Sequence, residues 1–289
     1  MAWADAWTAQ HKPSEAVQSL RAQEAEHAQL VATSYGRLLD QLEVEFAAHA
    51  AALDLVNYTD RTTWPGHRSV QHMLLSANAK SFHTSIDLLR RGHYEDCLAL
   101  TRGLYETFAR ALFISCYPDT TRSTLAPAPK GTRAFKLTNF LRDDLKLQWS
   151  SQYSIMSTFA HSRAFQVVQA WERTATRTGD PERFGVTHGF DPALFELAAP
   201  FLQFVLFAHL RFTTDQLVGG SDVSDPEALR TAHEARDLLS FGLETHPKPY
   251  WQQVRSDLDD VFAVVDTADQ GGDWRTLIQD LRPPPPEET

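Results

Sequence analysis

The sequence predicts an all-α protein, a helical bundle with a long N-terminal helix and additional C-terminal helices. Apolar residues recur at intervals of three and four through most of the 289-residue chain, which is the period of a buried helix face. No segment shows the alternation of a half-buried strand, and neither an internal repeat nor a sustained heptad is present. The composition, 43% hydrophobic and 22% charged, is that of a globular protein.

Residues 12–56 read as one long amphipathic helix. Pro13 and Ser14 suit its start. Its expected apolar stripe consists of Val17, Leu20, Leu30, Val31, Leu38, Leu42 and Phe46. Residues 57–66 are expected to form a loop.

A second helix is expected from about Ser69 to Arg91. We expect Gly92 to end it in a left-handed cap. Its expected apolar face consists of Val70, Met73, Leu74, Ala77 and Leu88. Residues 93–117 form the next predicted helix, and Pro118 stops it because proline cannot continue a helix.

The rest of the chain is predicted to be helical with longer connections. Helices are expected around 133–146, from a Ser150 or Ser151 cap to at least Phe165, over 192–218, and more weakly over 225–242 and 249–268. We interpret residues 1–282 as a single helical domain, with a central bundle at about 68–218 flanked by 12–56 and 225–268. Residues 283–289 are expected to be a disordered proline-rich tail.

Charge is unevenly distributed along this acidic chain of net charge −10. Residues 61–190 carry 17 Lys and Arg against 10 Asp and Glu, between two acidic flanks. This basic middle fits a surface for RNA or another anionic ligand, although two solvated acidic ends around an ordinary core would give the same count.

The sequence favours a cytoplasmic protein with no membrane association. No secretion signal is visible, and the apolar stretch Ala198–Ala208 is shorter than the roughly 20 residues of a membrane span. Cys97 and Cys116 fall on one predicted helix, about 28 Å apart, so they cannot pair within the chain. Free thiols are typical of a reducing compartment.

The candidate site begins with Arg102 and Glu106, two charges on a helix that is apolar on almost every side. A buried charge is costly unless it is paired and hydrogen-bonded, so partners are expected. Tyr153, Ser157 and His161 recur at helical spacing further along the chain and are the best candidates.

These five side chains would offer a cation, a carboxylate, hydroxyls and an imidazole. Such groups suffice for general acid–base catalysis with stabilisation of a developing oxyanion. They are also the groups with which a purely structural network fixes the register of two helices. Spacing alone leaves both readings open.

Four histidines invite a metal site, but their spacing argues against one. His72 and His83 lie three turns apart, too far for one zinc ion. His67 and His93 complete the set. The sequence therefore predicts a solvated histidine face and no metal or cofactor.

The segments Arg102–Glu106 and Tyr153–His161 resemble a bacterial all-helical family of unknown function, over about residues 70–165. That family is loosely similar to the HEPN group of helical bundles, many of which are metal-independent ribonucleases in toxin–antitoxin or phage-defence systems. HEPN proteins carry an arginine four to six residues before a histidine. Here Ile155, Met156 and Ser157 precede His161, so Arg102 or Arg163 would have to supply the arginine.

The resemblance implies a ribonuclease acting in stress or phage defence, as a homodimer that binds RNA or an antitoxin-like partner protein. Arg102, Glu106, Tyr153, Ser157 and His161 would form its catalytic site. The alternatives are a non-catalytic interaction or dimerisation module and a bundle that binds a small anionic ligand.

Overall fold

The computed structural model describes residues 15–58, 62, 64–121, 135–147, 149–160, 190–219 and 225–282. Within these ranges the protein is all-α and contains no strand, as predicted. Its longest helices are α2 (Glu15–Leu55), α5 (Tyr94–Cys116), α10 (Pro192–Arg211), α11 (Pro226–Glu244) and α12 (Pro249–Asp269). The shorter segments are η1 (Val56–Tyr58), α3 (Gly66–Ala77), α4 (Ala79–Arg91), η2 (Pro118–Thr120), α7 (Leu137–Asn139), η3 (Phe140–Asp144), α8 (Ser150–Ala160), η4 (Phe212–Val218) and α13 (Trp274–Leu281).

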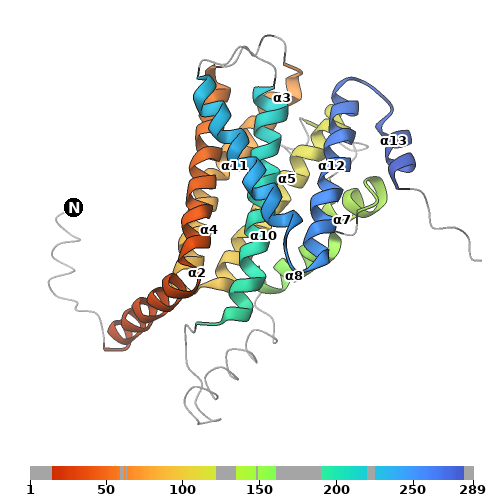
Figure 1. Cartoon of the computed structure of the whole chain (residues 1–289). Helices are drawn as coiled ribbons and strands as arrows, with labels where there is room; N and C mark the ends of the chain where they lie inside the picture. Colours follow the sequence, from red (N-terminus) through yellow and green to blue (C-terminus); the bar gives the residue numbers. More distant parts are fainter. Residues whose placement is uncertain are drawn as a thin grey trace, which may run out of the picture.

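Helices α5 and α10 form the centre of the bundle (Figure 1). Helix α5 packs against α3, α4, α8, α10 and α12, while α2 and α11 cover the other side of α10. Helix α10 is buried nearly all round, with Phe201, Phe204 and Phe207 each at most 1% exposed. The helical segment Pro192–Val218 is long and apolar enough for a membrane span, but 78% of its most apolar window is buried inside the bundle, as befits a core helix.

The ends of several elements follow the predicted chemistry. Gly92 caps α4 with φ 80°, and Pro118 opens η2 immediately after α5. Asp191 caps α10 by accepting a hydrogen bond from the Leu194 amide at 3.1 Å. Helix α13 was missed, although Asp273 before an apolar pair is an N-cap signal: its carboxylate accepts from the amides of Arg275 and Thr276.

The prediction of one helix over 69–91 is wrong in two respects: the helix is not continuous, and its first half buries a different face from the one expected. It is divided at Asn78 into α3 and α4, and Met73 is 57% exposed. Gln71 is buried instead, because its side-chain amide donates to the Ala111 carbonyl and to Ser115 Oγ, both at 2.8 Å. The buried face of α3 therefore contains the hydrogen-bonded Gln71, while Met73 points to solvent.

The stripe predicted on α2 is also partly wrong. Val31 and Leu42 are fully buried, but Val17 is 40% exposed and Leu30 is 42% exposed. In their place Glu45 and His49 are fully buried, because Leu42, Glu45, His49, Ala52 and Val56 follow the 3–4 period. The polar residues had hidden that stripe.

Downstream predictions hold where the structure describes them. Helices α11 and α12 match the expected ranges, and the expected helix 133–146 is a short α-turn followed by the π-helical η3. The predicted apolar helix 192–218 is α-helical to Arg211 and π-helical in η4. Pro13, Ser14, Arg163, Phe165 and the tail 283–289 lie outside the described residues.

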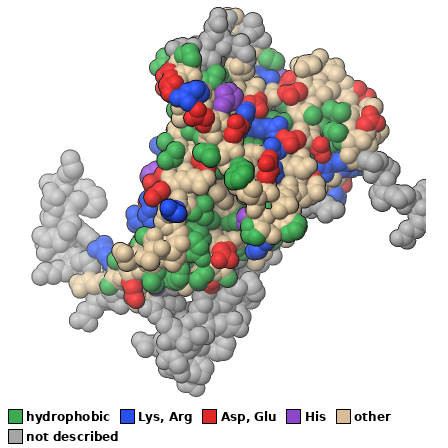
Figure 2. Space-filling view, in the orientation of Figure 1, with side chains coloured by type: hydrophobic (Ala, Val, Ile, Leu, Met, Phe, Trp, Pro, Cys, Tyr) green, Lys and Arg blue, Asp and Glu red, His purple; other side chains and the backbone are tan. Residues whose placement is uncertain are grey.

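The face that carries α11 and α12 is not of one charge sign. Figure 2 shows acidic and basic side chains intermixed there. Arg211 bonds Asp259 at 2.5 Å, and Arg236 bonds Asp215 at 2.7 Å. This face therefore gives no support to a broad anionic-ligand surface.

Candidate functional site

Arg102, Glu106 and Tyr153 meet where α8 packs against α5. Arg102 Nε donates to Glu106 Oε1 at 3.1 Å, and its Nη2 donates to the Tyr153 hydroxyl at 2.7 Å. That hydroxyl donates in turn to Glu106 Oε1 at 2.7 Å. The three side chains, called the Arg102 cluster below, close a ring of hydrogen bonds across two helices, as the sequence predicted for these positions.

The start of α8 is fixed from both sides, and this places Tyr153. Trp149, immediately before α8, donates its indole N–H to Asp257 Oδ2 of α12 at 3.0 Å. Its ring contacts Phe204 edge-on at 5.3 Å, while Tyr105 stacks with Tyr153 at 6.5 Å. Since Trp149 is buried and anchored, the first turn of α8 has little freedom relative to α5.

The expectation that the Arg102–Glu106 pair is buried is wrong. The side chains are 19% and 33% exposed, so the cluster lies at the edge of the α5–α8 contact. Arg102, Gly103, Glu106, Thr107 and Arg110 form a face of α5 that is not buried. Glycine and threonine between the charges made this face look apolar in the sequence.

Arg102 stays a cation under all ordinary conditions. Partial burial alone would lower its pKa, but the Tyr153 hydrogen bond and the Glu106 charge outweigh it and raise the pKa above the usual value. The guanidinium also lies over the Tyr153 ring at 4.9 Å. A positively charged, oriented and partly exposed group, paired with Glu106, therefore lies at this edge.

The remaining two predicted residues have different outcomes. Ser157 lies on α8 with its Oγ buried and without a hydrogen-bond partner, so it does not join the ring of hydrogen bonds. His161 follows Ala160, the last described residue of α8, and lies outside the described residues.

The histidine prediction is partly wrong. His72 is buried rather than solvated, whereas His83 is exposed; His67 is buried as well. His67 Nε2 lies 3.1 Å from Asp269 Oδ1, and His72 meets the Trp64 ring edge-on at 6.4 Å. Across the described ranges no group of three or more His, Cys, Asp or Glu side chains is arranged to hold a metal ion.

A second polar group lies in the core between α2, α4 and α10. The sequence predicts His209 as a satisfied core histidine, but His49 and Glu45 were missed. His49 is fully buried with neither ring nitrogen bonded, and its ring meets those of Phe82 and His209 edge-on at 5.6 and 6.0 Å. His209 is satisfied by the Val205 carbonyl at 2.9 Å and by Asn78 at 3.0 Å. Glu45, one turn before His49, bonds Gln41.

Comparison with protein-family models, curated proteins and solved structures found no match. The chemistry of the Arg102 cluster therefore has to be judged from its own geometry.

Proposed function

We propose that this chain is a HEPN-like helical-bundle protein that binds RNA at the Arg102 cluster and cleaves it without a metal ion. The observation that carries the proposal is the meeting of Arg102, Glu106 and Tyr153 at 2.7–3.1 Å on a partly exposed edge. These are three of the five residues on which the family resemblance rests. A fixed guanidinium suits a phosphodiester, which it can bind through parallel N–H donors.

In the proposed reaction the 2′-hydroxyl of RNA attacks the adjacent phosphorus. His161 takes the proton from the 2′-oxygen as the new P–O bond forms, and the bond to the 5′-oxygen breaks. The proton taken by His161 is passed to the 5′-oxygen, which leaves as a hydroxyl, and a 2′,3′-cyclic phosphate remains. Arg102 stabilises the extra negative charge on the phosphorane, while Glu106 and Tyr153 hold the guanidinium in position. Ser157 would assist with its unpaired hydroxyl.

The same proposal includes the cellular compartment, the biological role and the oligomeric state. The protein would act in the cytoplasm, in stress or phage defence, as a homodimer or bound to an antitoxin-like protein. Both cysteines are free and buried in α5, which fits a reducing compartment.

Arg102→Ala and His161→Ala are each expected to reduce RNA cleavage about 100-fold or more, since each removes a group that contacts the reacting phosphate. Helicity and melting temperature should stay close to the wild type, because a partly exposed pair contributes about 1 kcal/mol or less. Gel assays on labelled RNA, with circular dichroism melts in parallel, measure both quantities.

Arg110→Ala is the matched control, since Arg110 lies two turns further along the same exposed face of α5 and has no ion pair among the described residues. The control should cleave normally. Retained cleavage in Arg102→Ala, or an absence of RNA cleavage by the wild type, would contradict the proposal.

The second candidate is a non-catalytic interaction module. One observation favours it: the Tyr153 hydroxyl both accepts from Arg102 and donates to Glu106, so the ring of bonds is complete without a ligand. An Arg102→Met/Glu106→Leu double variant removes both charges. If it stays folded and still captures the partner that the wild type captures, without any RNA cleavage by either protein, the module is the correct reading.

A further inference from the structure

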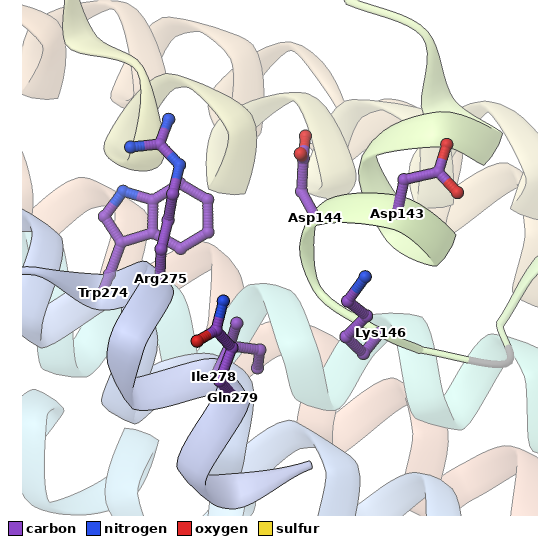
Figure 3. Close-up of a pocket in the computed structure, with 7 residues that line it drawn as sticks. All are labelled: Asp143, Asp144, Lys146, Trp274, Arg275, Ile278 and Gln279. Atoms are coloured by element: carbon purple, nitrogen blue, oxygen red, sulfur yellow. The ribbon is translucent and has the colours of Figure 1, made fainter. Parts of the chain in front are cut away.

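A small pocket opens between η3 and α13, apart from the Arg102 cluster (Figure 3). Its volume is about 110 Å³. Figure 3 shows Trp274, Arg275 and Gln279 of α13 on one side, with Asp144 and Lys146 on the other. This volume suits a single small polar group, because pockets for drug-sized ligands measure about 300–1,000 Å³.

Two cations of the pocket form no ion pair in the described part of the chain, although Lys146 interacts at longer range with Asp143 and Arg275 with Asp273. Neither the Lys146 ammonium nor the Arg275 guanidinium has an ion pair or side-chain hydrogen bond within the described part of the chain. Most of the described arginines are ion-paired, including Arg142 beside the pocket, which bonds both oxygens of Asp143 at 2.7 and 3.0 Å. Asp143 is therefore already paired. Asp144 also lines the pocket, so Arg142, Lys146 and Arg275 place three positive charges against two carboxylates, an excess of one.

Arg275 is held in place without losing its hydrogen-bond donors. Its guanidinium carbon lies 4.8 Å from the Trp274 ring centre and 5.3 Å from that of Tyr117. Trp274 is itself fixed, being 5% exposed and edge-on to Tyr117 at 5.5 Å. Stacking uses the faces of a guanidinium and leaves its N–H edge for an anion.

Lys146 occupies a backbone conformation that its side chain disfavours. Its φ is +54°, whereas the other three described residues with positive φ are all glycines. The neighbouring Leu145 and Leu147 are each 1% exposed, and their amides bond the carbonyls of Phe140 and Leu141 at 3.0 and 2.8 Å. A glycine would relieve the strain, so the ammonium is the property that a lysine adds here.

We propose that this pocket binds a phosphomonoester group. Arg275 would bind two phosphate oxygens through parallel N–H donors, and Lys146 would contribute a point charge to the third. Gln279 adds an amide donor, whereas a carboxylate ligand would leave one cation unmatched. The phosphate could belong to a free nucleotide or to the 5′ end of an RNA. The proposal shares no residue with the Arg102 cluster and does not depend on cleavage there.

The test is titration calorimetry of the full chain with adenosine 5′-monophosphate, and with one RNA oligomer carrying either a 5′-phosphate or a 5′-hydroxyl. We expect binding that weakens with added salt, and an Arg275→Gln variant that binds at least about tenfold more weakly. Binding of the mononucleotide indicates a nucleotide site. Tighter binding of the 5′-phosphorylated oligomer than of its 5′-hydroxyl form, without binding of the mononucleotide, indicates an RNA-end site.

Lys146→Gly separates ligand binding from folding. This variant should lose binding and yet melt no lower than the wild type, since it removes the ammonium and the backbone strain together. Lys80→Gln, at an exposed lysine of α4, is the control and should bind normally. Absence of phosphate-dependent binding, or unchanged binding in both pocket variants, would overturn the proposal.

Discussion

Acidification below about pH 6.5 is expected to destabilise the protein progressively, because His49 and His209 are buried as neutral side chains. Burial lowers the pKa of His49 to about 3, with a further contribution from His209. Burial also lowers the pKa of His209 to about 4, although its bond to the Val205 carbonyl acts in the opposite direction. In the unfolded chain both imidazoles take up a proton near pH 6.5.

Stability falls on acidification because the pKa of each histidine is lower in the folded protein than in the unfolded chain. The stability that the neutral rings contribute is complete above about pH 6.5 and is lost as the pH falls towards 4 and then 3. The shifts correspond to about 3 to 5 kcal/mol for each histidine, against a total stability of about 5 to 15 kcal/mol.

Acid titrations followed by circular dichroism measure this effect. His49→Leu loses no hydrogen bond, since neither ring nitrogen is bonded, and should move the acid midpoint to lower pH. His83→Gln, at an exposed position on α4, should leave the midpoint where it is. Equal midpoints for His49→Leu and the wild type would disprove the role of His49.

Replacing Glu45 with glutamine is expected to stabilise the protein by about 3 kcal/mol above pH 7. Burial raises the pKa of Glu45 to about 7, and the hydrogen bond from Gln41 only partly offsets this. The carboxyl is fully buried, and its Oε2 has no partner. Below about pH 4.5 the group is protonated in both states, so its burial is least costly there.

As the pH rises from about 4.5 through 7 the unfolded chain ionises first, and stability is lost over that interval. Urea denaturation at about pH 5 and about pH 8.5 should show the variant gaining stability only at the higher value. Glu43→Gln, an exposed neighbour paired with Arg90, should change little at either pH. A Glu45→Gln variant that gains nothing at high pH would show that the carboxyl is solvated.

Periodicity was enough to predict most of the helices, though not α13 or the break at Asn78, and it did not show which face some of them bury. Gln71, Glu45 and His49 occupy buried positions on α3 and α2, and a pattern built from aliphatic residues passes over them. Gln71 is accommodated there because Ala111 and Ser115 of α5 accept hydrogen bonds from its amide N–H groups, and such partners forty residues away leave no local signal.

The candidate site was predictable for a related reason. Arg102 and Glu106 stood out because charges are rare on a helix of the core, and Tyr153 was identified by its own helical spacing. Their exposure was not predictable, since it depends on where α8 ends its contact with α5. The pocket beside α13 could not be predicted from the sequence, because the unusual feature of Lys146 is its positive φ, which a sequence pattern does not reveal.

The two cysteines make the protein convenient to label. Cys97 and Cys116 are buried in α5, and burial raises the pKa of the Cys97 thiol to about 12 and that of Cys116 further. Protonated, inaccessible thiols react slowly with maleimides, whose target is the thiolate. A cysteine introduced at Tyr58, which is 65% exposed, would therefore take a fluorophore or spin label selectively in the otherwise unmodified chain.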